Sequence, residues 1–290
     1  MEVGFVGTGK MGLPIALNML KAGHKLTVWD VSQEATKELE ALGAARASSL
    51  EALANNVHVT FISLPNESIV EKIVCGDGGL LSGAHSGDTI FDLSTVSPSS
   101  TRRIAEYAAT RNVTLIDAPV SGSVTGAASG TLTLMIGTTK EVTRPYESVL
   151  TAIGTTFFYL GERGLGNTLK LINNLVALSN QVALCEAMAL ADRLGISRQV
   201  VGDVLGKSSA NSFILEKKLT DIVKHDYRPG FFVDLAYKDL SLAVEVAEQA
   251  GARIELGKQT HRLYGEASIA GFGKLDGSGI LALLEPASKS

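Results

Sequence analysis

Two residues that could move a proton and hold a hydroxyl group, Lys170 and Asn174, lie four positions apart. They follow a glycine-rich turn within an apolar stretch that includes Leu169, Leu171 and Ile172, so helical spacing places both on one face. Burial lowers the pKa of a lysine and suits its amine to proton transfer, and an asparagine amide can hydrogen-bond a substrate hydroxyl. The alternative is a lysine whose stem lies along a domain boundary with its ammonium group in water.

Small residues fill the segment 117–130, directly after a predicted strand. Ser121, Gly122 and Ser123 could present hydroxyl and backbone N–H donors to an anionic substrate, and Pro119 stiffens the entry to the segment. We therefore predict these three residues as substrate contacts. A flexible surface loop is the alternative for the same segment.

The beginning of the chain reads as a buried strand, a glycine turn and a helix. In Gly7-x-Gly9-x-x-Gly12 the first glycine allows a tight turn, the second lets the backbone approach phosphate, and the third lets helix and strand pack closely. The N–H groups of the following helix then face the pyrophosphate of a dinucleotide. The predicted phosphate-binding residues are Gly7, Thr8, Gly9, Lys10, Met11 and Gly12.

Asp30 ends the second predicted strand, about 20 residues beyond the glycines, where a carboxylate accepts hydrogen bonds from the adenosine ribose. Its charge would repel a 2′-phosphate, and no arginine follows in Val31-Ser32-Gln33, which favours NAD over NADP. A helix cap or turn residue is the alternative interpretation.

Further strands are predicted at 57–63, 89–92, 114–117 and 132–136, separated by helical or turn-rich segments, so we expect a parallel, doubly wound sheet. Ligands of such sheets bind beyond the carboxyl ends of the strands, and this predicts loops beside the cofactor. The residues of these loops are Leu64, Pro65, Asn66, Ser94 and Thr95. By spacing alone, Thr95 is an ordinary turn residue.

From Gly164 onward apolar residues recur at helical spacing, so the second half is predicted to be all-α. Its first helix, near 166–194, would be ~45 Å long at ~1.5 Å per residue, enough to bridge two domains. Lys238 lies in a later apolar-patterned helix, where a solvated charge pair with its neighbour is the simpler interpretation. The other predicted helices are 197–206, 210–224, 234–250, 255–270 and 276–284.

Composition favours small soluble partners. The 290 residues carry a net charge of −4 without a basic run, which disfavours nucleic-acid binding. Cys75 and Cys185 lack metal-ligand spacing and are predicted to be free buried thiols, which favours the cytoplasm. We expect no targeting segment, no metal site and no membrane span, because the apolar stretch 171–191 contains asparagine, glutamine and glutamate.

Four separated segments together resemble the motifs of the β-hydroxyacid dehydrogenase family, which includes 3-hydroxyisobutyrate dehydrogenase and tartronate semialdehyde reductase. These segments span nearly the whole chain: Gly7-x-Gly9-x-x-Gly12, Asp117-Ala118-Pro119-Val120-Ser121-Gly122, Gly164-x-Gly166-x-x-x-Lys170-x-x-Asn173-Asn174 and Lys238-Asp239-Leu240. The resemblance implies an α/β fold in which a Rossmann domain over 1–162 precedes an all-α domain over 163–290, with a long interdomain helix and the active site between the domains.

The resemblance also implies roles for individual residues. Lys170 would be the catalytic acid/base, with Asn174 beside it. Ser121, Gly122, Ser123 and Asn174 would position the substrate. Thr95 and Lys238 would contact the cofactor, and Leu64, Pro65 and Asn66 would line the nicotinamide ribose. The family commonly carries glycine where Ser123 stands, so the substrate cannot be copied from its best-known members. Such helical domains usually form homodimers or homotetramers.

The function predicted from this resemblance is NAD(P)-dependent interconversion of a small 3-hydroxy acid and its semialdehyde. A tartronate or succinic semialdehyde reductase is the nearest alternative, although those that use NADP tend to carry a basic cluster that this chain lacks after Asp30. An imine reductase usually replaces the lysine that stands here at position 170, and a non-catalytic dinucleotide-binding module would be expected to lose it.

Overall fold

The computed structural model describes residues 1–228 and 230–285. The chain divides into two compact units, one over Met1–Lys170 and one from Leu171 onward. The domain boundary predicted after residue 162 stays a prediction.

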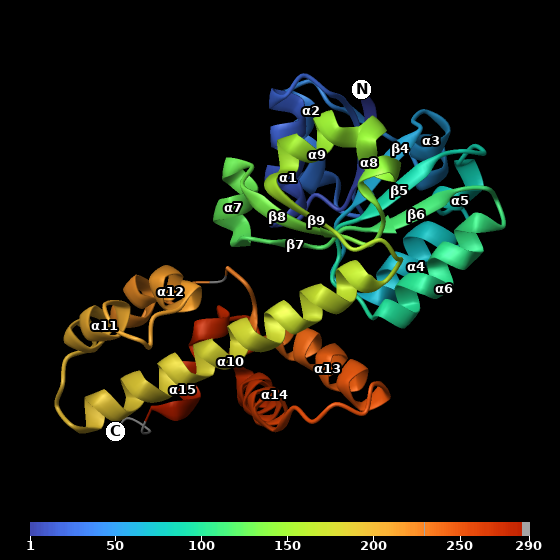
Figure 1. Cartoon of the computed structure of the whole chain (residues 1–290). Coiled ribbons are helices and arrows are strands. Elements are labelled where there is room, and N and C mark those ends of the chain that lie inside the picture. Colours follow the sequence, from blue (N-terminus) through green and yellow to red (C-terminus); the bar gives the residue numbers. More distant parts are fainter. Residues whose placement is uncertain (229, 286–290) are drawn as a thin grey trace. The chain divides into compact units, whose positions relative to one another are not determined.

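The first unit is built on a six-stranded parallel sheet with strand order β3-β2-β1-β4-β5-β6. This order is that of a doubly wound dinucleotide-binding sheet, and it confirms the predicted fold class. The strands are β1 (Glu2–Val6), β2 (Lys25–Trp29), β3 (Ala45–Arg46), β4 (Val59–Ile62), β5 (Thr89–Asp92) and β6 (Thr114–Asp117). Strands β4, β5 and β6 lie side by side in Figure 1. The connecting helices are α1 (Gly12–Lys21), α2 (Lys37–Ala41), α3 (Leu50–Asn55), α4 (Glu67–Cys75), α5 (Leu80–Gly83) and α6 (Pro98–Ala109).

Two hydrophobic cores cover the two faces of this sheet. Successive residues of a strand point to opposite faces, so Phe61 and Phe91 pack in one core while Ile62 and Ile90 pack in the other. The rings of Phe61 and Phe91 stack with centroids 4.8 Å apart. Burial on both faces explains why these strands read as continuous apolar runs.

A second, three-stranded sheet follows, made of β7 (Val120–Ser121), β8 (Leu132–Ile136) and β9 (Gly154–Tyr159). Strand β9 was not predicted, because its residues are largely half-buried or exposed and so lack a clear apolar run. The alternative of a flexible loop over 117–130 is wrong, because this segment forms β7 and α7 (Ser123–Ser129). The helices α8 (Lys140–Thr143) and α9 (Glu147–Ile153) complete the segment.

The second unit is helical, as predicted. Its helices begin with α10 (Leu165–Arg193), which starts in the first unit, and continue with α11 (Arg198–Gly206), α12 (Phe213–Val223), α13 (Val233–Gln249), α14 (Glu255–Ala267) and α15 (Leu281–Leu284). The helix predicted to begin at residue 210 begins later because the Ser212 hydroxyl accepts the N–H of Leu215 and caps it. The last two predicted helices are shorter, with a π turn at Ser268–Phe272 and a 3₁₀ turn at Gly277–Ile280.

The long helix α10 is a core helix of this unit. Leu178, Val182 and Cys185 are buried and pack in a cluster with Leu240 and Tyr264. Among the described residues, α10 is the one helix long and apolar enough to cross a membrane, and half of its apolar window is buried within the protein. Both cysteines are free, as predicted, but only Cys185 is buried, and the prediction of a buried thiol is wrong for Cys75, which is half-buried. Burial raises the pKa of the Cys185 thiol to about 12.

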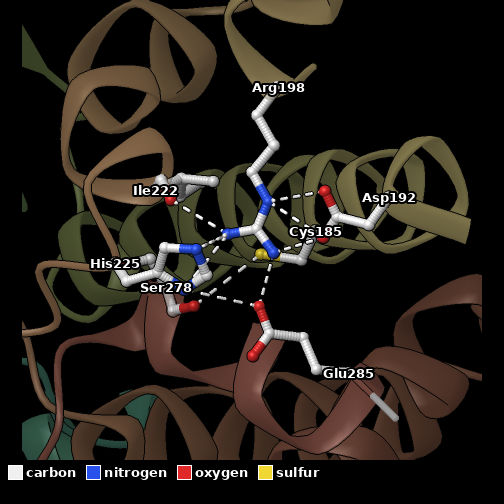
Figure 2. Close-up of polar contacts among 7 residues, drawn as sticks. All are labelled: Cys185, Asp192, Arg198, Ile222, His225, Ser278 and Glu285. Carbon is white, nitrogen blue, oxygen red and sulfur yellow. Dashed lines mark hydrogen bonds and ion pairs between the residues drawn. The ribbon is translucent and has the colours of Figure 1, made fainter. Parts of the chain in front are cut away.

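An arginine joins the far end of α10 to three other segments. Figure 2 shows Arg198, which is 8% exposed, between Asp192 at the end of α10 and Glu285 after α15. Its Nη1 also donates to the carbonyl of Ile222 at 3.2 Å. Burial lowers the pKa of Arg198, but hydrogen bonds to the two carboxylates raise it above its ordinary value. The guanidinium therefore fixes α10, α11, α12 and the end of α15 together.

Candidate active site

The glycine turn after β1 has the geometry that a dinucleotide phosphate needs. A Cβ at Gly7, where φ is +89°, would lie 2.3 Å from the carbonyl oxygen of Ser63, and a Cβ at Gly12 would lie 1.8 Å from that of Gly7. By contrast, a Cβ at Gly9 would meet nothing within 4 Å. The first and third glycines are thus required by close packing, whereas the second leaves open space over the backbone.

The N-terminus of α1 is free of side-chain caps. Met11 at the cap position makes no side-chain hydrogen bond to the helix, and the first turn holds no acidic residue. Amide groups at such an end favour an anion. The residues present therefore fit the pyrophosphate of a dinucleotide.

Asp30 lies beside the same turn, at the end of β2. Its Oδ2 accepts the backbone N–H of Thr8 at 2.8 Å and the Thr8 hydroxyl at 3.3 Å, and its Oδ1 accepts the N–H of Ser32 at 2.8 Å. The carboxylate is therefore held in a fixed position next to the backbone of the glycine turn. Oδ1, which accepts one hydrogen bond here, has further acceptor capacity for a ribose hydroxyl.

Hydrogen bonds order the two predicted cofactor loops that follow β4 and β5. The Oδ1 of Asp92 accepts the N–H of Ser94 at 2.8 Å, and the Ser94 hydroxyl accepts the N–H of Leu64 at 2.9 Å. Asn66 caps α4, since its Oδ1 accepts the N–H of Ile69 at 3.0 Å. Because the cap uses the amide oxygen of Asn66, the amide nitrogen Nδ2 is the group that could donate a hydrogen bond to a ligand.

The loop of predicted substrate contacts enters α7 through unusual backbone. Gly122 has φ of +137°, and a Cβ there would lie 2.9 Å from the Leu132 side chain. Ser123 has φ of +66°, in the left-handed region that side-chain-bearing residues rarely adopt. The amide of Asn18 in α1 donates to the carbonyl of Ala127 at 2.7 Å. This bond connects α7 to α1, the helix that follows the glycine turn.

Lys170 follows a tightly anchored helix start. The Asp117 carboxylate accepts the N–H of Gly164 at 2.9 Å and that of Asn167 at 3.0 Å. Burial raises the pKa of Asp117, and these backbone donors act in the opposite direction. Lys170 is half-buried, one turn after Asn167. Asn167 was not predicted as a site residue, although its place in the glycine-rich segment was the available signal.

In the second unit, a buried carboxylate connects two predicted site residues. Asn174 donates from Nδ2 to Asp239 Oδ2 at 2.6 Å, and Asn173 donates to Asn174 Oδ1 at 3.1 Å. The ammonium of Lys238 lies 2.9 Å from Asp239 Oδ1 in an ion pair without the geometry of a hydrogen bond. Because Asp239 is only 2% exposed, the interpretation of this pair as a solvated charge pair is wrong. The contact between Asn174 and Asp239 was missed because it joins α10 to α13.

A separate cluster of possible metal ligands lies at the amino ends of β4 and β5, the sheet edge opposite the cofactor loops. His58, His85 and Asp88 hold their ligand atoms within 4.8 Å of one another. Asp88 already accepts hydrogen bonds on both oxygens, from His58 Nδ1 at 2.8 Å and from the backbone N–H of His85 at 2.7 Å. A hydrogen-bonded turn accounts for this cluster.

The arrangement within each unit places the phosphate turn, Asp30 and the ordered loops at the carboxyl edge of the parallel sheet. Lys170 and the predicted substrate donors lie on segments that directly follow β6 or are anchored to its end. The second unit holds Asn174, Asp239 and Lys238 together. Such an arrangement can bind a dinucleotide and offer an amine for proton transfer.

Comparison with known proteins gives a consistent picture. Residues 2–161 match the family profile described as the NAD binding domain of 6-phosphogluconate dehydrogenase, and residues 164–284 match that described as the NAD-binding domain of NADP-dependent 3-hydroxyisobutyrate dehydrogenase. The chain is 35% identical over 286 residues to 2-(hydroxymethyl)glutarate dehydrogenase of Eubacterium barkeri, covering 98% of this chain and 95% of that protein. It is 33% identical to the NAD-dependent L-serine dehydrogenase of Pseudomonas aeruginosa, covering 98% of both chains.

A solved structure shows the same fold. The crystal structure of 3-hydroxyisobutyrate dehydrogenase from Salmonella typhimurium has a TM-score of 0.90 and 31% sequence identity, and the match covers 98% of this chain and 99% of that chain. The likeness therefore extends over the whole length of both proteins.

Proposed function

The chain belongs to the β-hydroxyacid dehydrogenase family, and from this membership we propose that Lys170 is the acid–base group of its active site. The protein is an NAD(P)-dependent oxidoreductase that interconverts a small hydroxy acid and its semialdehyde. The observation that carries the assignment of Lys170 is its position on a helix start that Asp117 anchors to the end of β6.

The cofactor is NAD or NADP, and we infer a preference for NAD. The Asp30 carboxylate, held by Thr8 and Ser32, would accept hydrogen bonds from the ribose hydroxyls and repel a 2′-phosphate. Val31, which follows Asp30, is 89% exposed and carries no positive charge that could offset the repulsion of a 2′-phosphate.

A bound nicotinamide cofactor would supply the hydride transfer to and from the substrate carbon. In oxidation, the neutral Lys170 amine accepts the proton of the 3-hydroxyl, and in reduction its ammonium form donates that proton to the carbonyl oxygen. Asn174, oriented by Asp239, would use its second N–H donor to hold the reacting oxygen. Lys238 is proposed to contact the cofactor, as are Thr95 and the loop Leu64–Asn66.

The substrate is proposed to be a small 3-hydroxy acid whose carboxylate is bound by Ser121, Gly122 and Ser123. The two curated relatives described above are named for 2-(hydroxymethyl)glutarate and L-serine, which both pair a hydroxymethyl group with a nearby carboxylate. Hydroxyl and backbone N–H donors at the entry to α7 suit that carboxylate.

We further propose that the protein is a homodimer or homotetramer. Pairs of apolar residues four positions apart are exposed on the helical unit, and such a surface favours a second copy of the chain. These pairs are Ile172 with Val176, Leu190 with Leu194, and Val200 with Val204. A cytoplasmic location is also part of this proposal.

The first experiment measures initial rates by nicotinamide absorbance. The panel contains 3-hydroxyisobutyrate, L-serine and 2-(hydroxymethyl)glutarate with NAD and with NADP, for the wild type and for Lys170→Ala. We expect activity with NAD to exceed that with NADP, and kcat to fall at least about 10²-fold in the variant while NADH still binds. Near-normal turnover by Lys170→Ala would contradict the assignment of the acid–base group.

A further inference from the structure

We propose that Asp117 and Asn167 are positioning residues that fix the first turn of α10, and with it Lys170, against the predicted substrate and cofactor loops. The proposal rests on the assignment of Lys170 as the acid–base group.

The carboxylate of Asp117 caps α10 from a distance of 47 residues along the chain. A helix leaves its first N–H groups without partners inside the helix, and here the two Asp117 oxygens accept the N–H groups of Gly164 and Asn167, at 2.9 and 3.0 Å. A carboxylate at this end is also favoured by the helix dipole. The cap thus fixes α10 to the carboxyl end of β6.

Two glycines leave room for this cap. A Cβ at Gly137 would lie 2.1 Å from Asp117 Oδ1, and a Cβ at Gly166 would lie 2.8 Å from Asp117 Oδ2 and 2.4 Å from the carbonyl oxygen of Met135. The second glycine of the segment 164–166 is therefore required by the carboxylate and by the neighbouring strand β8.

Asn167 fixes the same turn to a second loop. It is fully buried, its Oδ1 accepts the N–H of Val96 at 3.0 Å, and its Nδ2 donates to the hydroxyl of Thr101 at 3.1 Å. Val96 directly follows Thr95, the predicted cofactor contact. The Asp117 carboxylate and the Asn167 amide therefore connect the end of β6, the start of α10 and the loop at Val96. The relative positions of these segments matter for hydride and proton transfer.

The hydrogen-bond network of Asp117 and Asn167 holds the turn of α10 that carries Lys170. The lysine lies three residues after Asn167, on the turn that the network holds, and the predicted substrate donors follow Asp117 by four to six residues. A shift of about 1 Å in a reacting group can lower a rate by about 10²-fold.

The test compares Asp117→Asn with Asp88→Asn. In Asp117→Asn, an NH2 group replaces one acceptor oxygen and faces a backbone N–H that then lacks its acceptor. We therefore expect kcat to fall about 10- to 100-fold. The Kd of NADH should stay within about twofold of the wild-type value. The deuterium isotope effect on kcat should rise, because transfer becomes slower relative to product release. Asp88 is the matched control, since it is also buried in the first unit and accepts two hydrogen bonds.

A second pair of variants tests the amide. Thr101→Val removes the acceptor of Asn167 and should lower kcat about three- to tenfold, whereas Thr101→Ser keeps the hydroxyl and should restore the rate. Hydrogen exchange of the peptide covering residues 164–170 should be faster in both Asp117→Asn and Thr101→Val.

Two results would overturn the proposal. The first is unchanged hydrogen exchange of the peptide 164–170 in Asp117→Asn together with a normal kcat. The second is a loss of activity in Asp117→Asn that is no larger than its loss of folded protein and is equally large in Asp88→Asn. The two proposals fail on different measurements. An active Lys170→Ala variant would contradict the acid–base assignment, whereas hydrogen exchange at 164–170 tests the positioning role without that variant.

Discussion

Ser123 shows how one residue of the candidate site departs from its local preference. It has a side chain at φ of +66°, where glycine is favoured. The left-handed conformation costs a residue with a Cβ roughly 1–2 kcal/mol. A strained residue within a predicted substrate loop suggests that its hydroxyl serves the substrate.

Replacing Ser123 separates these two effects. Ser123→Gly should stabilise the first unit by about 0.5–1 kcal/mol, because relief of strain exceeds the added entropy of the unfolded chain. Both Ser123→Gly and Ser123→Ala should raise the KM of the preferred substrate about 5- to 10-fold, since each loses one hydrogen bond. Thermal unfolding and initial rates measure the two effects. An unchanged KM in both variants would remove Ser123 from the substrate contacts.

At the scale of elements, the end of α10 depends on one buried cation. Arg198 connects Asp192, the carbonyl of Ile222 and Glu285, so four elements share its guanidinium (Figure 2). Removing it takes the guanidinium from two carboxylates whose side chains are only 35% and 26% exposed, and leaves Glu285 with His225 at 3.6 Å.

We expect Arg198→Met to lower the free energy of unfolding of the helical unit by about 2–3 kcal/mol, allowing for the partial exposure of the carboxylates. Arg198→Lys should recover only part of this loss, because an ammonium cannot form the planar fork. Urea unfolding should be followed by far-UV circular dichroism, since the single tryptophan, Trp29, lies in the first unit. Arg228→Met, which removes an exposed pair with Asp226, is the control and should leave the midpoint unchanged.

At the scale of the whole molecule, exposed apolar residues gather on α10 and α11. Val200 and Val204 are 54% and 59% exposed, and Leu190 and Leu194 are 59% and 66% exposed. Side chains four positions apart lie on one face of a helix, so each pair forms an apolar strip. Burial of these strips would favour assembly by roughly 25 cal/mol for each Å² of apolar surface.

The wild type is therefore expected to elute as a dimer or tetramer in size-exclusion chromatography with light scattering. Val200→Lys combined with Val204→Lys should shift it toward smaller species, because two buried ammonium groups would lack partners. Val142→Lys, at an exposed position of α8 in the first unit, is the matched control and should keep the wild-type mass. A monomeric wild type at micromolar concentration would contradict the proposed assembly.

Features that depend on local spacing could be predicted from the sequence. The glycine turn, the strand ending at Asp30 and the helical start before Lys170 each lie within one short segment, where steric demands and periodicity act directly. The parallel sheet followed from alternating strands and helices, and the predicted family is confirmed by the comparisons.

The contacts that order these segments depend on tertiary packing and could not be predicted. Asp117 reaches α10 across 47 residues, and Asn174 reaches Asp239 across 65. Neither pair is visible as a periodic pattern, because the partners meet only after the strands and helices have packed. The strand β9 escaped prediction for the same reason, since pairing with β8 rather than its own apolar pattern makes it a strand.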